Sequence, residues 1–163
     1  MTQTIKLFTT IVTLLAIAAT TACQTTKLDP KNPKGNLIIT MERTPCYGRC
    51  PIYEIKIYDD GLLLYSGKKF VEKEGSAYRK LSTQDIENLK TAFTAADFFN
   101  LSKSYPDSGR VPSDLPSIII SYKQNILEKT VTDHRFHTPE SLTAIEKRID
   151  SAATLQFLQF YDN

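Results

Sequence analysis

A β-hairpin is predicted by residues 53–66, YEIKIYDDGLLLYS, and this hairpin decides the fold class. Tyr53, Ile55 and Ile57 alternate with the residues between them, which is the pattern of a half-buried strand. Asp59-Asp60-Gly61 follows as a tight turn, because Asp-Gly between alternating segments is a strong hairpin signal. Residues 62–66 return as the partner strand. The chain therefore contains antiparallel β-structure.

Further strands are predicted on both sides of this hairpin. Residues 37–42 alternate as a preceding strand, and residues 76–81 add one strand after the hairpin. Later in the chain, residues 118–122, a Gln124-Asn125 turn and residues 126–131 predict a second hairpin. Residues 105–116 contain three prolines and a glycine, so they are expected to form a loop.

Two helices are predicted, one after each group of strands. The first begins at Ser82, which is placed as N-cap with Asp85 in the first turn, and its buried residues recur at helical spacing: Ile86, Leu89 and Phe93. The second has Thr138 as N-cap, Pro139 at the first helical position and Glu140 in the first turn. Its buried residues are expected to be Leu142, Ile145 and Ile149. Residues 155–160 are amphipathic but too short to assign.

These elements predict one α+β domain. Sequential hairpins favour an antiparallel sheet built from two hairpin-containing halves, each followed by a helix packed on one face. About 128 residues remain from Asn36 onward, which is enough for one domain with a core and too few for two.

The N-terminal 23 residues resemble a bacterial lipoprotein signal peptide. Lys6 precedes an apolar run that ends in small residues and Cys23, and a polar segment follows. We expect residues 1–22 to be removed, Cys23 to carry lipid, and residues 23–35 to be a flexible tether to a domain at residues 36–163. Two alternatives stay open: a secretory signal cut after Ala22, and an uncleaved membrane anchor.

The expected location is the periplasm, with the chain attached to the outer membrane through the lipid on Cys23. Gln24 follows that cysteine, whereas Asp at this position favours inner-membrane retention in enterobacterial-type sorting; retention there and surface exposure both stay open. Removing residues 1–22 leaves 19 basic and 18 acidic residues, with no basic patch interleaved with aromatics. Nucleic-acid binding is therefore not expected.

The three cysteines leave one pair to explain if Cys23 carries lipid. An oxidising compartment favours a disulfide between Cys46 and Cys50. Three alternatives stay open for this pair: a redox-active dithiol, reduced thiols, and a metal site. His134 and His137 are the only histidines and would complete a Cys₂His₂ zinc site. The Cys-x-x-x-Cys-Pro spacing also resembles the copper-binding motif of Sco-type copper chaperones.

Recognised catalytic constellations are absent from the sequence. It contains no Gly-x-Ser-x-Gly elbow, phosphate loop or His-Glu-x-x-His motif, so no catalytic residue and no cofactor is assigned. The candidate binding residues lie in two loops: Tyr47 and Arg49 between the cysteines, and Asp107 and Asp114 in the proline-rich segment.

The segment 41–53 resembles a bacterial domain of unknown function. That domain is marked by an Arg-x-x-Cys-x-Gly-x-Cys-Pro-x-Tyr signature, matched here by residues 43–53, and the resemblance extends loosely to Phe160. The resemblance implies an exported or lipid-anchored protein with no assigned activity. We therefore expect a noncatalytic module that binds an envelope protein or another envelope component, with thiol-redox or copper or zinc handling through Cys46 and Cys50 as the alternative.

Overall fold

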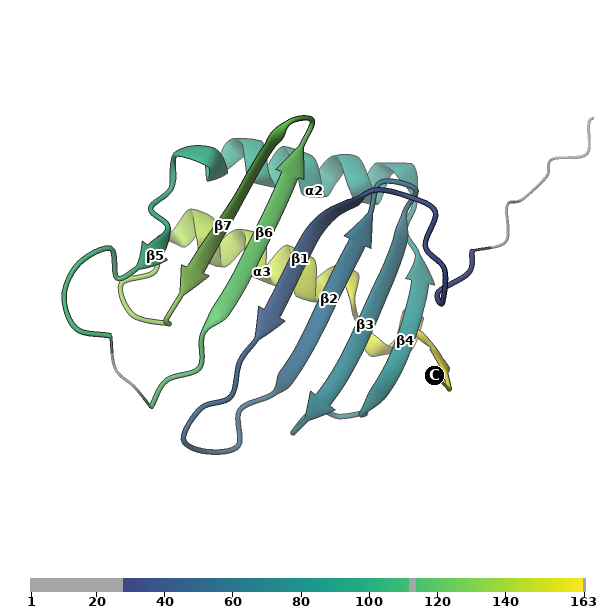
Figure 1. Cartoon of the computed structure of the whole chain (residues 1–163), viewed down its shortest axis with the longest axis horizontal. Helices are drawn as coiled ribbons and strands as arrows, with labels where there is room; N and C mark the ends of the chain where they lie inside the picture. Colours follow the sequence, from purple (N-terminus) through teal and green to yellow (C-terminus); the bar gives the residue numbers. More distant parts are fainter. Residues whose placement is uncertain (1–27, 112–113, 163) are drawn as a thin grey trace, which may run out of the picture.

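Eight strands form a single sheet in the computed structural model, which describes residues 28–111 and 114–162 (Figure 1). The sheet order is β5-β7-β6-β1-β2-β3-β4-β8. The strands are β1 (Leu37–Arg43), β2 (Ile52–Tyr58), β3 (Leu62–Lys69), β4 (Gly75–Lys80), β5 (Ser104–Tyr105), β6 (Ile118–Gln124), β7 (Leu127–Asp133) and β8 (Gln159–Tyr161). Cys23 and the predicted signal peptide lie outside the described residues.

The predicted first hairpin is confirmed as β2 and β3. Ile55 pairs with Tyr65 and Ile57 pairs with Leu63, and all four side chains are buried. Gly61 ends the turn at a φ of 86°, and a Cβ built on it would lie 2.6 Å from the carbonyl oxygen of Leu81. Glycine is required here because any side chain would meet both the strained φ and this close backbone approach.

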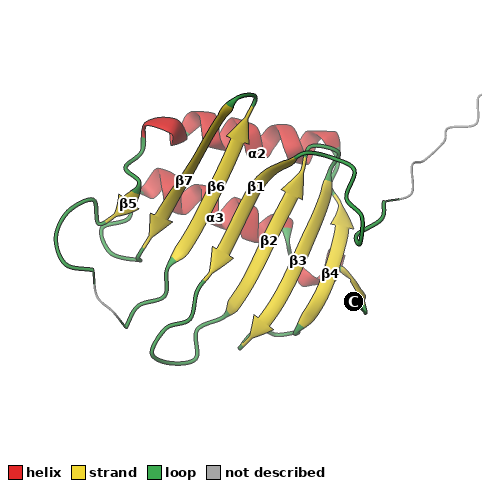
Figure 2. Ribbon diagram, in the orientation of Figure 1, coloured by secondary structure: helices red, strands yellow, loops and turns green. Residues whose placement is uncertain are grey.

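Two helices, α2 (Thr83–Ala95) and α3 (Glu140–Ala152), cover one face of the sheet (Figure 2). The start of α2 is confirmed: Ser82 Oγ accepts from the backbone N–H of Asp85 at 3.1 Å, and Asp85 Oδ2 accepts from that of Ser82 at 2.9 Å. This reciprocal capping satisfies two N–H groups that lack partners within the helix.

The start of α3 differs from the prediction. Pro139 is the N-cap and makes no side-chain cap, so Thr138 is not the cap residue. Thr138 Oγ1 instead donates to Asp133 Oδ1 at 2.6 Å. The hydroxyl hydrogen bonds to a buried carboxylate, which is a charged and therefore strong acceptor, and the oxygen accepts from no N–H group of the first helical turn.

The core lies between the two helices and the inner face of the sheet. Apolar side chains on alternate strand positions meet the helical residues at spacings of three and four. The buried residues include Ile39, Met41, Ile55, Ile57, Leu63, Ile118, Ile120 and Val131 from the strands, and Ile86, Leu89, Phe93, Leu142, Ile145 and Ile149 from the helices.

The description of the sheet as two hairpin-containing halves is not confirmed. β1 lies at the centre and pairs with both β2 and β6, while β8 pairs with β4 on the far side of the sheet. The sheet is also not wholly antiparallel, because β5 pairs with β7 in parallel. In the second hairpin, Gln124 pairs with Leu127, so the turn is Asn125-Ile126, one residue later than predicted.

Candidate functional site

Four connecting segments gather at one end of the sheet, which we call the disulfide end (Figure 1). It comprises residues 44–51, 70–74, 106–117 and 134–138, of which 112 and 113 are not described. The opposite end carries the turns at residues 59–61 and 125–126. Both loops that hold the candidate binding residues therefore lie at the same end.

Cys46 and Cys50 form a disulfide bond, as predicted. The Cα atoms of the two residues are 5.8 Å apart, and the χ3 angle of the bridge is 97°. Tyr47, Gly48 and Arg49 lie between them and are exposed. The bridge closes a short loop between β1 and β2, so these three residues are presented at a fixed position.

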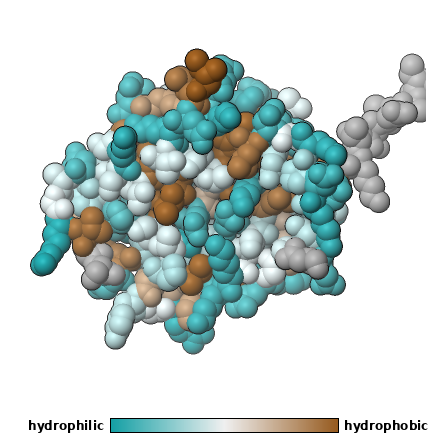
Figure 3. Space-filling view, viewed as in Figure 1, coloured by the Kyte–Doolittle hydropathy of each residue, from teal (hydrophilic) through white to brown (hydrophobic). Residues whose placement is uncertain are grey.

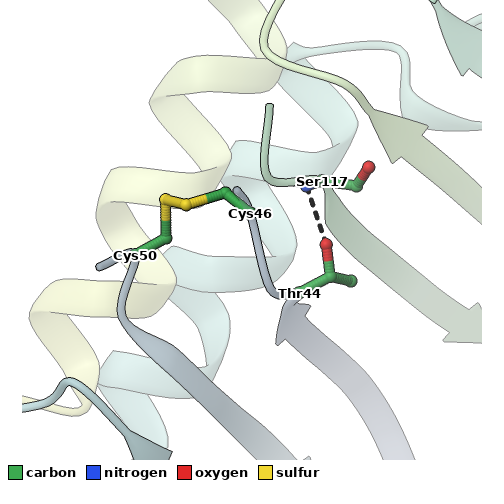
Figure 4. The surroundings of a disulfide bond; sticks show 4 residues. All are labelled: Thr44, Cys46, Cys50 and Ser117. Atoms are coloured by element: carbon green, nitrogen blue, oxygen red, sulfur yellow. Dashed lines mark hydrogen bonds between the residues drawn. A yellow bond between two sulfur atoms is a disulfide. The ribbon is translucent and has the colours of Figure 1, made fainter. Parts of the chain in front are cut away.

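Hydrogen bonds join this loop to the proline-rich loop. The backbone N–H of Thr44 donates to the Ser117 carbonyl at 2.9 Å, and the Ser117 N–H donates to Thr44 Oγ1 at 2.8 Å (Figure 4). Closer to the tip, the Tyr47 N–H donates to the Asp114 carbonyl at 3.2 Å. The structure thus brings Tyr47 and Asp114, predicted as parts of separate loops, into direct contact.

The other two candidate binding residues have different surroundings. The Arg49 guanidinium lies 5.5 Å from the ring centroid of Phe70, so Arg49 covers the turn between β3 and β4. Asp107 is exposed and accepts a long hydrogen bond of 3.4 Å from Ser108 Oγ. Arg49 therefore belongs to the disulfide loop and its neighbouring turn, whereas the contact of Asp107 is local.

Several exposed apolar side chains lie at the disulfide end. Tyr47 is 94% exposed, and partial exposure is shared by Phe136, Val111 and Leu115. The opposite end carries Ile126, which is 96% exposed at the tip of the β6–β7 hairpin, where Figure 3 shows a hydrophobic patch at the top. Exposure alone therefore does not distinguish the two ends.

A three-residue anchor holds the base of the disulfide loop against α3. Arg43 Nε donates to Tyr53 Oη at 2.6 Å, and Arg43 Nη2 donates to Asp150 Oδ2 at 2.5 Å. Tyr53 Oη in turn donates to Asp150 Oδ1 at 2.5 Å. Burial, followed by the bond to Asp150, raises the pKa of Tyr53, so the phenol stays protonated and keeps donating.

This anchor explains the outer residues of the signature. Arg43 is the last residue of β1, and Tyr53 lies at the start of β2, so both flank the disulfide loop. Their shared partner, Asp150, comes from α3, far away in sequence. The signature therefore combines an exposed disulfide-closed loop with the side chains that fasten its two ends to the helical layer.

A pocket of about 260 Å³ adjoins the anchor. Its apolar walls include Pro51, Phe70 and Leu155, and its lining also carries the polar side chains of Tyr53, Tyr65, Glu72, Asp150 and Thr154. An apolar hollow with a few convergent polar groups is the usual form of a site that receives a side chain or small ligand.

The alternative Cys₂His₂ metal site is not formed. Both sulfurs are bonded to each other, and His134 Nδ1 is 2.8 Å from Ser117 Oγ. Within residues 28–111 and 114–162, no group of three or more His, Cys, Asp or Glu residues is placed to hold a metal ion. Thiolate ligands are unavailable while the disulfide is intact, which is the chemical reason for the difference.

A buried acidic pair, Asp133 and Glu146, was not predicted from the sequence. Asp133 at the end of β7 and Glu146 on α3 are each 1% exposed, and Arg135 contacts both. One signal was available: Glu146 follows Leu142 by four residues and precedes Ile149 by three, so it lies within the apolar stripe of α3. An acid at such a position is buried with its helix face.

Together, the fold and the site define a small α+β domain that presents a disulfide-closed loop at one end of a sheet. The chain belongs to a family described as a domain of unknown function, DUF6438, whose model matches residues 37–153. No curated protein matches the chain. Neither helix in the described part of the chain is long and apolar enough to cross a membrane.

Proposed function

We propose that this chain is a lipid-anchored, noncatalytic binding module that faces the periplasm and contacts an envelope protein through its disulfide end. One observation carries the proposal: the Tyr47 side chain is 94% exposed on a loop closed by a disulfide and hydrogen-bonded to a second loop. Aromatic residues that enter a partner's pocket contribute a large share of binding energy at interfaces.

The rigidity of the loop supports this role. Ordering a flexible loop on binding costs conformational free energy, and a loop that is already ordered avoids this cost. The disulfide fixes the ends of the segment that contains Tyr47, and the hydrogen bond from the Tyr47 N–H to the Asp114 carbonyl fixes the backbone at Tyr47 itself. The loop that carries Tyr47 is therefore already ordered before a partner binds.

The surroundings of Tyr47 have the composition of an interface. Exposed Phe136, Val111 and Leu115 supply further apolar area at the same end of the sheet. Arg49, Asp107 and Asp114 supply charges of both signs. An apolar centre with a charged rim is the common anatomy of protein–protein contacts, and the pocket of about 260 Å³ beside Pro51 offers a place for a partner's side chain.

The lipid anchor in this proposal is inferred from the N-terminal sequence. A basic residue, an apolar run and small residues precede Cys23, and Gln24 follows it. A diacylated cysteine would hold the domain at the membrane, because two acyl chains give stable attachment where one does not. The absence of Asp after Cys23 favours the outer membrane.

The lipid anchor is tested by labelling cells with an alkyne analogue of palmitate. We expect the wild-type chain to carry label and to sediment with membranes, and Cys23→Ser to lose the label and leave the membrane fraction. Cys46→Ser is the matched control, because it also removes one thiol but should keep the label. Label that persists in Cys23→Ser would contradict lipidation at this residue.

The binding end is tested by photo-crosslinking in intact cells. A photoreactive phenylalanine replaces Tyr47 in one variant and Ile126 in another, since both residues are almost fully exposed and lie at opposite ends of the sheet. We expect a discrete adduct from position 47 that is absent from position 126 and is lost when Cys46→Ser and Cys50→Ser are combined with it. Equal adducts from both positions would contradict a specific binding end.

A second candidate function is thiol–disulfide exchange through Cys46 and Cys50. It is favoured by the half-buried state of both residues at the surface of the domain, which leaves the bridge open to a partner's dithiol. In this reaction the partner's two thiols would be oxidised to a disulfide and the Cys46–Cys50 bridge reduced. Mass spectrometry of protein purified without reductant separates the two functions: a bridge that resists mild reduction argues against exchange.

A further inference from the structure

Two carboxyl groups are buried together between β7 and α3. Asp133 and Glu146 are each only 1% exposed, and acidic residues are almost never so deeply buried without compensating partners. The cationic groups around Glu146 are Arg135, in the turn after β7, and Arg43, at the end of β1. Arg43 is already hydrogen-bonded to Asp150, so Arg135 is the close partner of the pair.

In each carboxyl group, one oxygen accepts hydrogen bonds from neighbouring donors. Asp133 Oδ1 accepts from the Arg135 backbone N–H at 2.7 Å and from Thr138 Oγ1 at 2.6 Å. Glu146 Oε2 accepts from Arg135 Nη1 at 3.0 Å. The other two oxygens, Asp133 Oδ2 and Glu146 Oε1, are buried and accept from no N–H or O–H donor of the described residues.

One proton would satisfy both of these oxygens. Glu146 and Asp133 lie within side-chain hydrogen-bond reach of each other, so a protonated Glu146 would donate to the Asp133 carboxylate, and Arg135 would balance the remaining negative charge. Burial and then the neighbouring charge of Asp133 raise the pKa of Glu146 to about 8, from an ordinary value of 4.5. The arrangement of the oxygens and the direction of this shift therefore agree.

The same residues shape a strained turn. Arg135 has a φ of 61° and His137 a φ of 58°, both in the left-handed region that non-glycine residues rarely occupy. Such conformations persist where surrounding contacts hold them. Here, Asp133 Oδ1 accepts from the Arg135 N–H and from the Thr138 hydroxyl, which lie on either side of Phe136 in sequence. This carboxylate therefore holds the turn that presents Phe136 at the disulfide end.

We propose that the Asp133–Glu146 pair binds one proton that holds the 134–138 turn in place, so that the binding end of the domain is regulated by pH. Loss of this proton would place two facing negative charges beside one Arg135 and would weaken the clamp on the turn. The consequence for partner binding rests on the proposed function, but the proton and the turn are properties of the free protein.

The direction of the pH effect follows from linkage. Between about pH 4.5 and pH 8 the folded chain holds the Glu146 proton and the unfolded chain does not, so the stability that this proton contributes falls as the pH rises through this interval. Above about pH 8 both states have released the proton, and this dependence ends.

The proposal is tested by ¹³C NMR of glutamate carboxyl groups in the full chain from pH 4 to pH 9.5. We expect the Glu146 resonance, assigned by its absence in Glu146→Gln, to titrate with a midpoint near 8, and the amide signals of Arg135 and Phe136 to move with it. A Glu146 midpoint below 5, or turn amides that ignore the Glu146 transition, would overturn the proposal.

Two variants complete the test. Glu146→Gln keeps the size of a protonated glutamate, so its turn amides should stay at their low-pH positions throughout, and finding them at the high-pH positions would count against the proposal. Glu140→Gln removes an exposed carboxyl from the same helix and should leave the transition unchanged.

The histidines of the turn supply the competing explanation. A transition of the turn amides near pH 6.5 that disappears when His134→Gln and His137→Gln are combined would assign the effect to imidazole and overturn the proposal. Because all of these signals come from the free protein, they do not depend on whether Tyr47 crosslinks to a partner. Failure of the binding proposal and failure of the proton clamp are therefore distinguishable.

Discussion

The two ends of the sheet show the same degree of exposure but are built differently. Tyr47 at the disulfide end and Ile126 at the opposite end are both more than nine-tenths exposed. The opposite end is closed by short turns, and the side-chain contact between Asn36 and Asp59 there is exposed. The disulfide end combines a covalent bridge, a partly buried Arg43–Tyr53–Asp150 anchor and a buried acidic pair.

This difference shows where the chain buries charged groups, whose removal from water costs free energy. Buried charged groups contribute little net stability and are strongly destabilising when one partner is removed. A turn needs none of them, as residues 59–61 and 125–126 demonstrate. Their concentration at the disulfide end indicates that the conformation of its loops, rather than the stability of the sheet, is what these residues specify.

The largest expected effect comes from removing the buried carboxylate of Asp133, with the exposed Asp59 at the opposite end as the comparison. Asp133→Ala leaves the Arg135 N–H and the Thr138 hydroxyl without their buried acceptor, so we expect a loss of about 2–4 kcal/mol in the free energy of unfolding. Asp59→Ala removes exposed hydrogen bonds to Asn36 and should cost no more than about 1 kcal/mol. Urea unfolding measures both, and equal losses would remove the contrast between the ends.

The disulfide bridge should rank second. The combined variant Cys46→Ser and Cys50→Ser is expected to lose about 2 kcal/mol, because a five-residue loop constrains the unfolded chain only modestly. The urea midpoint of the wild type with and without reductant checks this value without any mutation. A reduced protein that unfolds at the same urea concentration as the oxidised one would show that the bridge orders only its own loop.

The Tyr53 hydroxyl should contribute somewhat less. Tyr53→Phe removes the bonds to Arg43 and Asp150 but leaves those two residues joined, so we expect a loss of about 1–2 kcal/mol. Tyr78→Phe is the matched control on the outer face of β4, with an expected change below about 0.5 kcal/mol. Thermal unfolding of the two variants side by side gives the comparison, and indistinguishable midpoints would refute the anchor.

The smallest effect on stability is expected from the two exposed residues themselves. Tyr47→Ser and Ile126→Ser should each change the free energy of unfolding by less than about 0.5 kcal/mol, because neither side chain is packed. Circular dichroism in urea measures this change. A large loss in Tyr47→Ser would mean that this residue supports the fold and does not serve as a contact for a partner.

Local patterns in the sequence predicted most of the elements. The alternation in residues 53–66 and the capping residue Ser82 act within a few positions, so β2, β3 and the start of α2 follow from sequence alone. The central position of β1, the parallel β5 and the pairing of β8 with β4 depend on contacts between distant segments, which periodicity does not encode. For this reason the predicted division into two halves failed.

The site was predictable to a similar degree. The Cys46–Cys50 disulfide was predicted because cysteines are visible in the sequence, whereas the contact between Tyr47 and Asp114 was not, because it joins two separate loops. Asp150 and Glu146 were missed because an acid on a helix looks like an ordinary surface charge until its partners are known. Thr138 was wrongly predicted to be an N-cap, because its hydroxyl hydrogen bonds to the buried Asp133, and this contact is not visible in the sequence.

The position of β8 has a consequence for synthesis of the chain. β8 pairs with β4, although both helices and three other strands lie between them in sequence. A ribosome releases these segments in order, so the outer edge of β4 stays unpaired until residues 159–161 have emerged. An open strand edge is a template for pairing with other chains. Residues 159–161 therefore cover a strand edge that is open to pairing with other chains for as long as β8 has not been added to the sheet.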